Sequence, residues 1–282
     1  MNNTLKTFLL MAALTALFMV VGQMLGGQQG MLIALLMAVA LNFFAYWNSD
    51  KMALSMNHAR EVSQAEAPDL HALVGSLAAR AGLPMPRVYV VENATPNAFA
   101  TGRNPDHAAV AVTTGLLQVL DRQELEGVIA HELAHIKNYD ILISSIAAVM
   151  AGALSYLTTM AQWGMLFGGG RSEEEGGSGN MLVTLVTIIV APLAALLIQM
   201  ALSRSREYLA DATGAEICGR PRQLASALEK LADHNAQRPM DVNPASAQMY
   251  IVNPLKSSSL AGLFSTHPPM EERISRLRAM ER

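Results

Sequence analysis

The sequence is short of charge, of aromatic residues and of cysteine. Only 15% of its 282 residues are charged and 5% are aromatic, whereas 51% are hydrophobic. With a mean hydropathy of +0.26, the chain is too apolar for an ordinary soluble domain of this length. It also lacks a long basic run and has a net charge of −3, which argues against a nucleic-acid partner. We therefore expect a protein that meets the lipid bilayer.

Cysteine occurs once, at Cys218, so an intrachain disulfide is excluded. A single cysteine fits a reducing compartment but does not establish one, because many proteins outside the cytoplasm also lack disulfides. We interpret Cys218 as a small buried thiol and not as a metal ligand.

The most specific chemical pattern is the H-E-x-x-H sequence at residues 131–135. Residues four apart lie on one face of an α-helix, so the imidazoles of His131 and His135 can reach one metal ion. Glu132 then stands beside that ion, where metalloproteases have their general base. The pattern predicts two zinc ligands and a catalytic glutamate. Because H-E-x-x-H also arises by chance in helices, it needs support from its surroundings.

The residues before the pattern supply part of that support. Asp121 stands three residues before Glu124, which is the signature of a capped helix start. Apolar residues then recur at helical spacing, at Leu125, Val128, Ile129, Leu133 and Ile136. The two histidines are therefore predicted to lie on one capped helix.

A third zinc ligand is expected downstream, because catalytic zinc generally takes three protein ligands. Glu207 and Asp211 are four apart on a predicted helix. One carboxylate can bind the metal while the other accepts the free ring N–H of a ligand histidine. This predicts Glu207 as the ligand and Asp211 as the partner of a histidine. A salt bridge from Asp211 to Arg204 or Arg206 is the alternative.

Four hydrophobic stretches are long enough to cross a bilayer, which takes ~20 helical residues. The first two, residues 5–25 and 31–47, are joined by a glycine-rich turn. They predict a transmembrane hairpin over residues 1–48, and aromatic residues at the end of the second stretch suit the membrane interface.

The other two stretches, residues 141–167 and 181–202, predict a second hairpin with the loop 168–180 between them. The alternative is a buried helical hairpin in a soluble core, which would have to be covered on all sides. The soluble parts are then residues 49–140 and 203–282.

The orientation follows from the basic residues near the ends of the spans. Those on one side are Lys6, Lys51, Arg60, Arg122, Lys137, Arg204 and Arg206. The positive-inside rule places both termini and the catalytic parts in the cytoplasm and the loop 168–180 outside. Two spans separate His135 from Glu207, so the chain returns to the same side and the predicted ligands can meet.

The soluble part before the metal helix has a mixed pattern. A helix is predicted at residues 69–81, closed by Gly82 and Pro84. Three strands are predicted at residues 87–91, 97–101 and 108–113. We expect them to form a small antiparallel sheet or hairpin.

Four motifs stand out together: residues 97–100, 131–135, 205–211 and 265–269. On four spans, they resemble the HtpX family of bacterial heat-shock-associated membrane metalloproteases, whose relatives include the CAAX-processing membrane endopeptidases. The resemblance covers essentially the whole chain. It implies a mainly α membrane protein with four transmembrane helices and a cytoplasmic α+β, zincin-like catalytic domain of the gluzincin type with a small sheet.

The resemblance also implies a function. It predicts an endopeptidase with one Zn²⁺ per chain, in the bacterial cytoplasmic (inner) membrane, that removes misfolded or damaged membrane proteins during stress. Its partners would be protein substrates and the bilayer, and self-cleavage is expected where its own loops meet the site. The alternatives are a processing peptidase with one defined substrate and a membrane scaffold with structural zinc. A scaffold would leave Glu132 unexplained.

Two further candidates come from the resemblance, which places the H-P-P segment and a following arginine at the active site. His267 and Arg273 are therefore candidate donors to the oxyanion of the transition state, with His267 grouped with Glu132 as catalytic. In the alternative, His267 only begins a helix over residues 268–280, because its two prolines suit a first turn.

Substrate binding is expected at an edge strand, as in related zinc proteases, where the substrate backbone adds to the sheet. The strand at residues 97–101 is the candidate, with Asn97 binding a main-chain amide. The alternative is an internal strand with Asn97 in a turn after Pro96. Residues 238–262, which contain prolines and little periodicity, are the better candidate for a lid.

Overall fold

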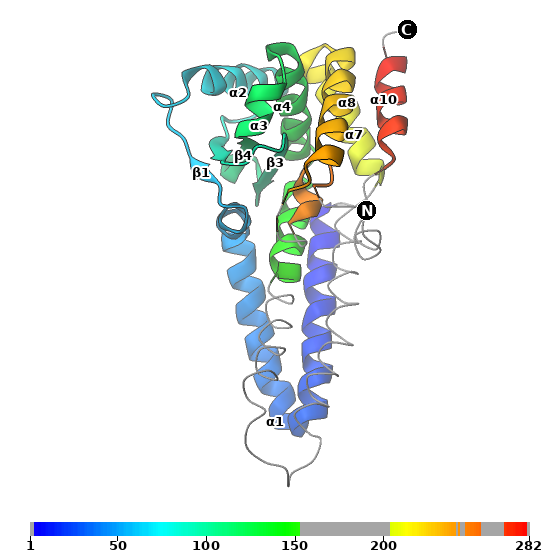
Figure 1. Ribbon diagram of the computed structural model, residues 1–282. Coiled ribbons are helices and arrows are strands. Elements are labelled where there is room, and N and C mark those ends of the chain that lie inside the picture. The colour runs from blue at the N-terminus through cyan, green and yellow to red at the C-terminus, as the bar shows by residue number, and fades with distance from the viewer. Residues whose placement is uncertain (1–2, 153–203, 241, 243–245, 255–267, 281–282) are drawn as a thin grey trace, which may run out of the picture.

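The computed structural model describes residues 3–152, 204–240, 242, 246–254 and 268–280. Figure 1 shows a pair of long antiparallel helices at one end and the sheet with most of the other helices at the other end, while the helix Ile141–Gly152 packs against the long pair. His267, the predicted span at 181–202 and most of the span at 141–167 lie outside the described residues.

The N-terminal hairpin is one helical element, α1 (Asn3–Met56), with a break inside it. The break is at Gly26 and Gly27, and Gly27 has a φ of 59°, which glycine adopts without strain. Close to the turn, a Cβ on Gly22 would lie 2.5 Å from the carbonyl oxygen of Gly30. The two arms can approach this closely only because both positions are glycine. The predicted helical hairpin is thus present.

The second arm, Gly26–Met56, is long and apolar enough to cross a membrane. In the first arm, the described apolar helix Leu5–Val20 is shorter. Large apolar side chains point outward from the second arm, among them Leu36 at 71% exposure and Phe43 at 67%. Such a surface is costly in water but suits hydrocarbon.

The second arm continues past residue 47, where the sequence pattern placed its end. Ala53 and Leu54 are buried in a cluster with Phe99 and Tyr250, beneath the sheet. Asp50 also pairs with Arg87 at 2.6 Å. The helix runs on to Met56 because packing against the sheet stabilises turns that hydropathy alone does not select.

The sheet has four strands in the order β1-β2-β4-β3. The elements of this half are β1 (Arg60–Glu61), α2 (Pro68–Ala81), β2 (Arg87–Val91), β3 (Ala98–Gly102), η1 (Pro105–His107), β4 (Ala108–Thr113), α3 (Thr114–Val119) and α4 (Arg122–Lys137). β3 and β4 form the expected antiparallel hairpin, but β2 pairs with β4 in parallel. The expectation of an antiparallel sheet was wrong on this pair, since strand periodicity carries no information on direction. The sheet is mixed.

Both faces of the sheet are covered. Val88, Val110 and Ala100 belong to the main core, which also holds the apolar faces of α2 and α4. The alternate residues, such as Ala109 and Phe99, pack on the other side against the end of α1 and the region around Tyr250. This period of two explains why every residue of β3 and β4 is buried.

The second half of the chain wraps around α4. Its described elements are α7 (Arg204–Cys218), α8 (Pro221–Gln237), η2 (Ala247–Met249) and α10 (Met270–Ala279), and an apolar helix Ile141–Gly152 follows α4. Helices α4 and α7 approach closely at Gly214 on α7, where an added Cβ would lie 2.8 Å from Cα of His131. α7 therefore lies directly against the metal helix.

Candidate metal centre

α4 begins as predicted. The Asp121 side chain accepts from the main-chain N–H groups of Gln123 and Glu124, and the Glu124 side chain accepts from that of Asp121. This capping box fixes the first turn and the rotation of the helix. His131 and His135 then face the same side, and their Nε2 atoms are 3.1 Å apart.

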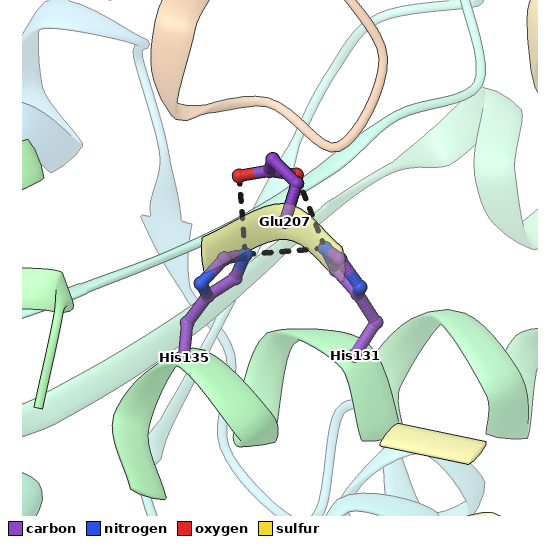
Figure 2. A group of neighbouring side chains, drawn as sticks. All are labelled: His131, His135 and Glu207. Atoms are coloured by element: carbon purple, nitrogen blue, oxygen red, sulfur yellow. Dashed lines mark hydrogen bonds and ion pairs between the residues drawn. The ribbon is translucent and has the colours of Figure 1, made fainter. Parts of the chain in front are cut away.

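Glu207 reaches this pair from α7. Its Oε2 lies 3.8 Å from His131 Nε2, and its Oε1 lies 3.8 Å from His135 Nε2 (Figure 2). Each of the three residues offers one ligand atom, and these atoms all lie within 4.8 Å of one another. The structure thus brings together the three residues that the sequence assigned to zinc.

Asp211 lies one turn beyond Glu207 and supports His131. Its Oδ1 is 2.9 Å from His131 Nδ1, which leaves Nε2 directed at the cluster. Arg273 from α10 binds both oxygens of Asp211, at 2.8 Å and 2.7 Å. The sequence pattern found Asp211 but considered Arg204 and Arg206 as its salt-bridge partners, whereas the partner is Arg273.

His135 has its own carboxylate, which sequence reasoning missed. Asp140 Oδ1 and Oδ2 lie 3.0 Å and 3.1 Å from His135 Nδ1. Asp140 is 2% exposed and stands just before the apolar helix Ile141–Gly152. The available signal was an acidic residue next to the start of a long apolar run, where burial of an unpaired charge would be expensive.

The electrostatics of the cluster favour a cation. Burial lowers the pKa of His131. Burial also acts to lower the pKa of His135, but Asp140 and Glu207 outweigh it and raise the pKa. For Asp211, burial acts to raise the pKa, yet Arg273 and His131 bring it down to about 2. The carboxylates at the cluster are Glu132, Asp140, Glu207 and Asp211, and the arginines are Arg206 and Arg273. This excess of negative charge suits a divalent metal ion.

Glu132 lies beside the cluster and is 1% exposed. Burial raises its pKa to about 8. Its Oε1 is buried and has no hydrogen-bond partner among the described residues. The carboxylate is therefore available for a reacting group.

A cavity of about 20 Å³ lies at the cluster, and it is lined by Glu132, His135 and Glu207. That volume holds about one water molecule. The segment Gln248–Ile251 forms another wall of the cavity. The main-chain N–H of Ile251 donates to the carbonyl oxygen of Ala98 on β3 at 3.0 Å. In this conformation the segment covers the site, and all of it lies within the predicted lid region 238–262.

The edge-strand candidate lies where the sequence placed it in the sheet. β3 pairs with β4 alone among the described strands, and Ala100 lines the cavity. The Asn97 side chain does bind main-chain groups, but they belong to this chain. It donates to the carbonyl oxygen of Val252 at 2.8 Å and accepts from the N–H of Val252 at 3.3 Å.

Arg273 is fully buried, with 0% exposure, and its donors are engaged. Besides Asp211, it donates to the carbonyl oxygen of Ile251 at 2.8 Å, and its Nη1 lies 3.7 Å from Glu207 Oε2. These contacts make Arg273 a support for Asp211 and for the covering segment. A direct role at the oxyanion would require these bonds to change.

The donor set fits a catalytic zinc ion. Two imidazole nitrogens and one carboxylate oxygen converge, and each imidazole is oriented by a carboxylate on its other nitrogen. Three protein ligands are typical of catalytic zinc, whereas structural zinc generally has four, and here the buried Glu132 stands beside them with its Oε1 unpaired among the described residues. This arrangement defines the site of a metal-dependent hydrolase.

The class is established by comparison. Residues 64–281 match peptidase family M48. The match covers more than half of the chain and contains the whole cluster, so the chain belongs to this family of metalloproteases.

Close relatives narrow the family. A protein named Protease HtpX homolog from Desulforapulum autotrophicum is 58% identical over 278 residues, which are 99% of this chain and 90% of the relative. The namesake in Persephonella marina is 58% identical and covers 99% of this chain and 98% of the relative. The Protease HtpX homolog from Ralstonia pickettii is 56% identical, and the match covers 99% of this chain and 97% of the relative. Within family M48 the chain is therefore a member of the HtpX proteases, as the motifs predicted.

A solved structure shares the fold. The crystal structure of Ste24p from S. mikatae matches with a TM-score of 0.53 at 17% sequence identity. The match covers 97% of this chain and 65% of the Ste24p chain. At this level of identity the likeness concerns the fold alone.

Proposed function

We propose that this metalloprotease uses one zinc ion held by His131, His135 and Glu207. The convergence of these three side chains beside the buried Glu132 is the observation that carries the proposal. When bound, zinc supplies Lewis acidity, which polarises the scissile carbonyl group and makes water acidic enough to attack near neutral pH.

Glu132 is proposed as the general base and then the general acid. It accepts a proton from the attacking water, which forms the new C–O bond. It then delivers that proton to the amine nitrogen as the C–N bond breaks. Its burial keeps solvent away from the carboxylate, so the proton passes between the two reacting groups.

The test is the Glu132→Gln variant. We expect zinc content and thermal stability to be retained and the rate of peptide cleavage to fall by about 10²–10⁴-fold. Glu126→Gln is the matched control, because Glu126 is on the same helix but pairs with Arg122 and Arg220 away from the cluster. Cleavage at the wild-type rate by the zinc-loaded Glu132→Gln protein would refute the assignment.

The substrates are proposed to be misfolded or damaged membrane proteins. The apolar hairpin α1 runs directly into the packing beneath the sheet, so the catalytic part is attached close to a bilayer. His135 is oriented by Asp140, which immediately precedes the apolar helix Ile141–Gly152. Both features support a site near the headgroups, where loops and tails of membrane proteins are exposed. Self-cleavage is expected there too.

The bacterial inner membrane is the proposed location, with four spans and both termini in the cytoplasm. The distribution of basic residues in the sequence supports this orientation. Fusion reporters after residue 60 and at residue 282 should both report the cytoplasm. A reporter signal outside the cytoplasm at either position would contradict the topology.

Substrate breadth separates the proposal from its rivals. The enzyme in detergent is incubated with zinc and with an unfolded membrane protein or casein, and the products are mapped by mass spectrometry. Many cleavage sites support quality control, whereas one defined site in one substrate would favour a processing peptidase. No cleavage, with zinc needed only for stability, would favour a scaffold. Addition of a chelator should abolish cleavage.

The substrate backbone is proposed to add along β3, next to Glu132. Ala98 on this strand is already hydrogen-bonded to Ile251, and Gln248–Ile251 wall the cavity. A peptide can enter only if that segment moves aside, because the cavity holds about one water molecule. The segment is thus one of the described parts of the proposed lid.

A further inference from the structure

Arg206 is a buried arginine whose two terminal nitrogens have no hydrogen-bond partner in the part of the chain that the structure describes. It precedes Glu207 on α7, and its residue is 8% exposed. Its Nη1 and Nη2 atoms are both buried and have no hydrogen-bond partner among the residues that the structure describes. A buried guanidinium that is not paired is unfavourable, so this residue calls for a group that satisfies it.

A second buried arginine in the same region, Arg273, has partners for its hydrogen-bond donors. Arg273 makes three hydrogen bonds, two to Asp211 and one to the Ile251 carbonyl oxygen. Arg206 senses the charges of Asp140 and Glu207 but forms no hydrogen bond or ion pair with either within the described part of the chain. Arg273 therefore has a structural task, whereas the Nη1 and Nη2 donors of Arg206 are unused within the described residues.

Arg206 lines the catalytic cavity. The residues around that cavity include Glu132 and His135. Gln248 lines it as well, is 6% exposed, and has no hydrogen-bond partner for its amide oxygen or nitrogen among the described residues. Two polar side chains with unused hydrogen-bonding groups thus face the place where a substrate reacts.

We propose that Arg206 binds a carboxylate of the peptide substrate close to the scissile bond. A guanidinium fork matches the two oxygens of a carboxylate and pairs with both. A main-chain carbonyl oxygen would leave part of the fork and the whole charge uncompensated. Gln248, which both donates and accepts, is suited to a peptide group of the same substrate.

The proposal deepens the proposed protease function and rests on it. The carboxylate has two possible sources, an acidic side chain next to the scissile bond or the C-terminus of the substrate. Both use the same chemistry at Arg206. Either source would make this enzyme selective among the many segments that an edge strand can accept.

The experiment compares matched peptides on the full chain in detergent with zinc. One pair differs only by Glu or Gln beside the scissile bond, and a second pair differs only by a free or amidated C-terminus. The wild type should cleave one carboxylate-bearing peptide with a kcat/KM about 10-fold to 100-fold higher than that of its neutral partner. The pair that shows the preference identifies the source.

Arg206→Gln should abolish that preference, so that within this variant the two members of the pair are cleaved with equal kcat/KM. Arg204→Gln is the matched control, since it removes the same charge from the same helix at an exposed position. A second readout is binding of the fluorescent peptides to Glu132→Gln protein, measured by anisotropy with and without Arg206→Gln. Zinc content is measured in every variant.

Several results would overturn the proposal. These are equal cleavage of both members of each pair by the wild type, or a preference that survives in Arg206→Gln. If Arg206→Gln loses zinc, Arg206→Lys retains the charge without the fork, and an unchanged preference in that variant also contradicts it. If the wild type cleaves no peptide, the proposed function fails, while the anisotropy measurement still decides whether Arg206 selects a carboxylate.

Discussion

The two histidines of the cluster are held in different ways. His131 is fully buried and is supported by Asp211, which in turn is bound by Arg273 through both oxygens. The side chain of His135 is 18% exposed and is supported by Asp140, at the start of an apolar helix. One side of the cluster is thus a closed network between α4, α7 and α10, and the other adjoins a predicted span.

The difference shows how one metal site joins two kinds of structure. The His131 side depends on ion pairs within the catalytic part, where Asp211 lies between His131 and the guanidinium of Arg273. The His135 side connects the site, through Asp140, to the apolar helix Ile141–Gly152, which belongs to a predicted membrane span. Movement of that segment would change the orientation of one ligand while the other stays fixed.

Removing one carboxylate from each side gives the largest expected contrast. In Asp211→Asn, the Arg273 guanidinium stays buried without its counter-ion, which costs about 3–5 kcal/mol of stability. In Asp140→Asn, the group that loses its carboxylate is His135, whose side chain is 18% exposed, and the expected loss is about 1–3 kcal/mol. Zinc affinity should fall roughly 10–100-fold in both variants.

The measurements are thermal unfolding in detergent and zinc competition with a chelator. Arg276→Gln serves as a control, because its pair with Glu272 is solvent-exposed and contributes little. Equal loss of stability in Asp140→Asn and Asp211→Asn would remove the contrast between the two sides.

Gly214→Ala tests the same network by geometry, with an intermediate effect. The added methyl would meet Cα of His131 at 2.8 Å, so α7 must move away from α4. Overpacking of this kind costs about 1–3 kcal/mol. Because Glu207 and Asp211 ride on α7, we expect weaker zinc binding together with the loss of stability.

Gly75→Ala is the matched control for this variant. Within 4 Å of a Cβ added at Gly75, the described neighbour is the Met85 sulfur, and its distance of 3.5 Å is an ordinary van der Waals contact. Stability and zinc binding should be unaffected or slightly improved, since alanine favours the helix. Retention of wild-type zinc affinity in Gly214→Ala would show that the helix contact does not set the ligand position.

Asn97→Ala has the smallest expected effect. It removes the side chain that binds the N–H and carbonyl groups of Val252, while Arg273 still holds Ile251. A loss of about 1–2 kcal/mol in local stability should speed amide exchange at Val252 by about 5-fold to 30-fold. Hydrogen–deuterium exchange measures it, with Asn104→Ala, at a half-buried position whose side chain caps η1, as control. Unchanged exchange would show that Asn97 does not hold the covering segment.

Local elements could be predicted from the sequence because their signals are local. The Asp121 capping box fixes the start of α4, and Gly82 in the left-handed conformation ends α2. The strand at Arg87–Val91 has the predicted bounds, and β3 is shifted by one residue from the prediction. Capping groups and β-branched runs act within a few residues, so the chain carries them visibly.

Features that depend on distant partners were not predictable in this way. The parallel pairing of β2 with β4 needs the placement of β3 at the edge, and the extension of α1 to Met56 needs the underside of the sheet. Asp140 could not be assigned to His135 from the sequence, because the contact depends on the backbone conformation of the turn after α4. In the sequence, Arg206 is one basic residue among several near a predicted span, and its burial depends on how α7 packs.

By itself, the sequence determined the chemistry of the site. The four-residue spacing within each pair, His131 with His135 and Glu207 with Asp211, follows helical periodicity and puts both members on one face of a helix. Only the tertiary structure decided which carboxylate orients each histidine, which arginine pairs with Asp211, and which segment covers the cavity. Those answers come from contacts between segments far apart in the chain, such as Arg273 with Asp211 and Ile251 with Ala98. Such contacts are selected by the fit of the whole core and leave no periodic trace in either segment.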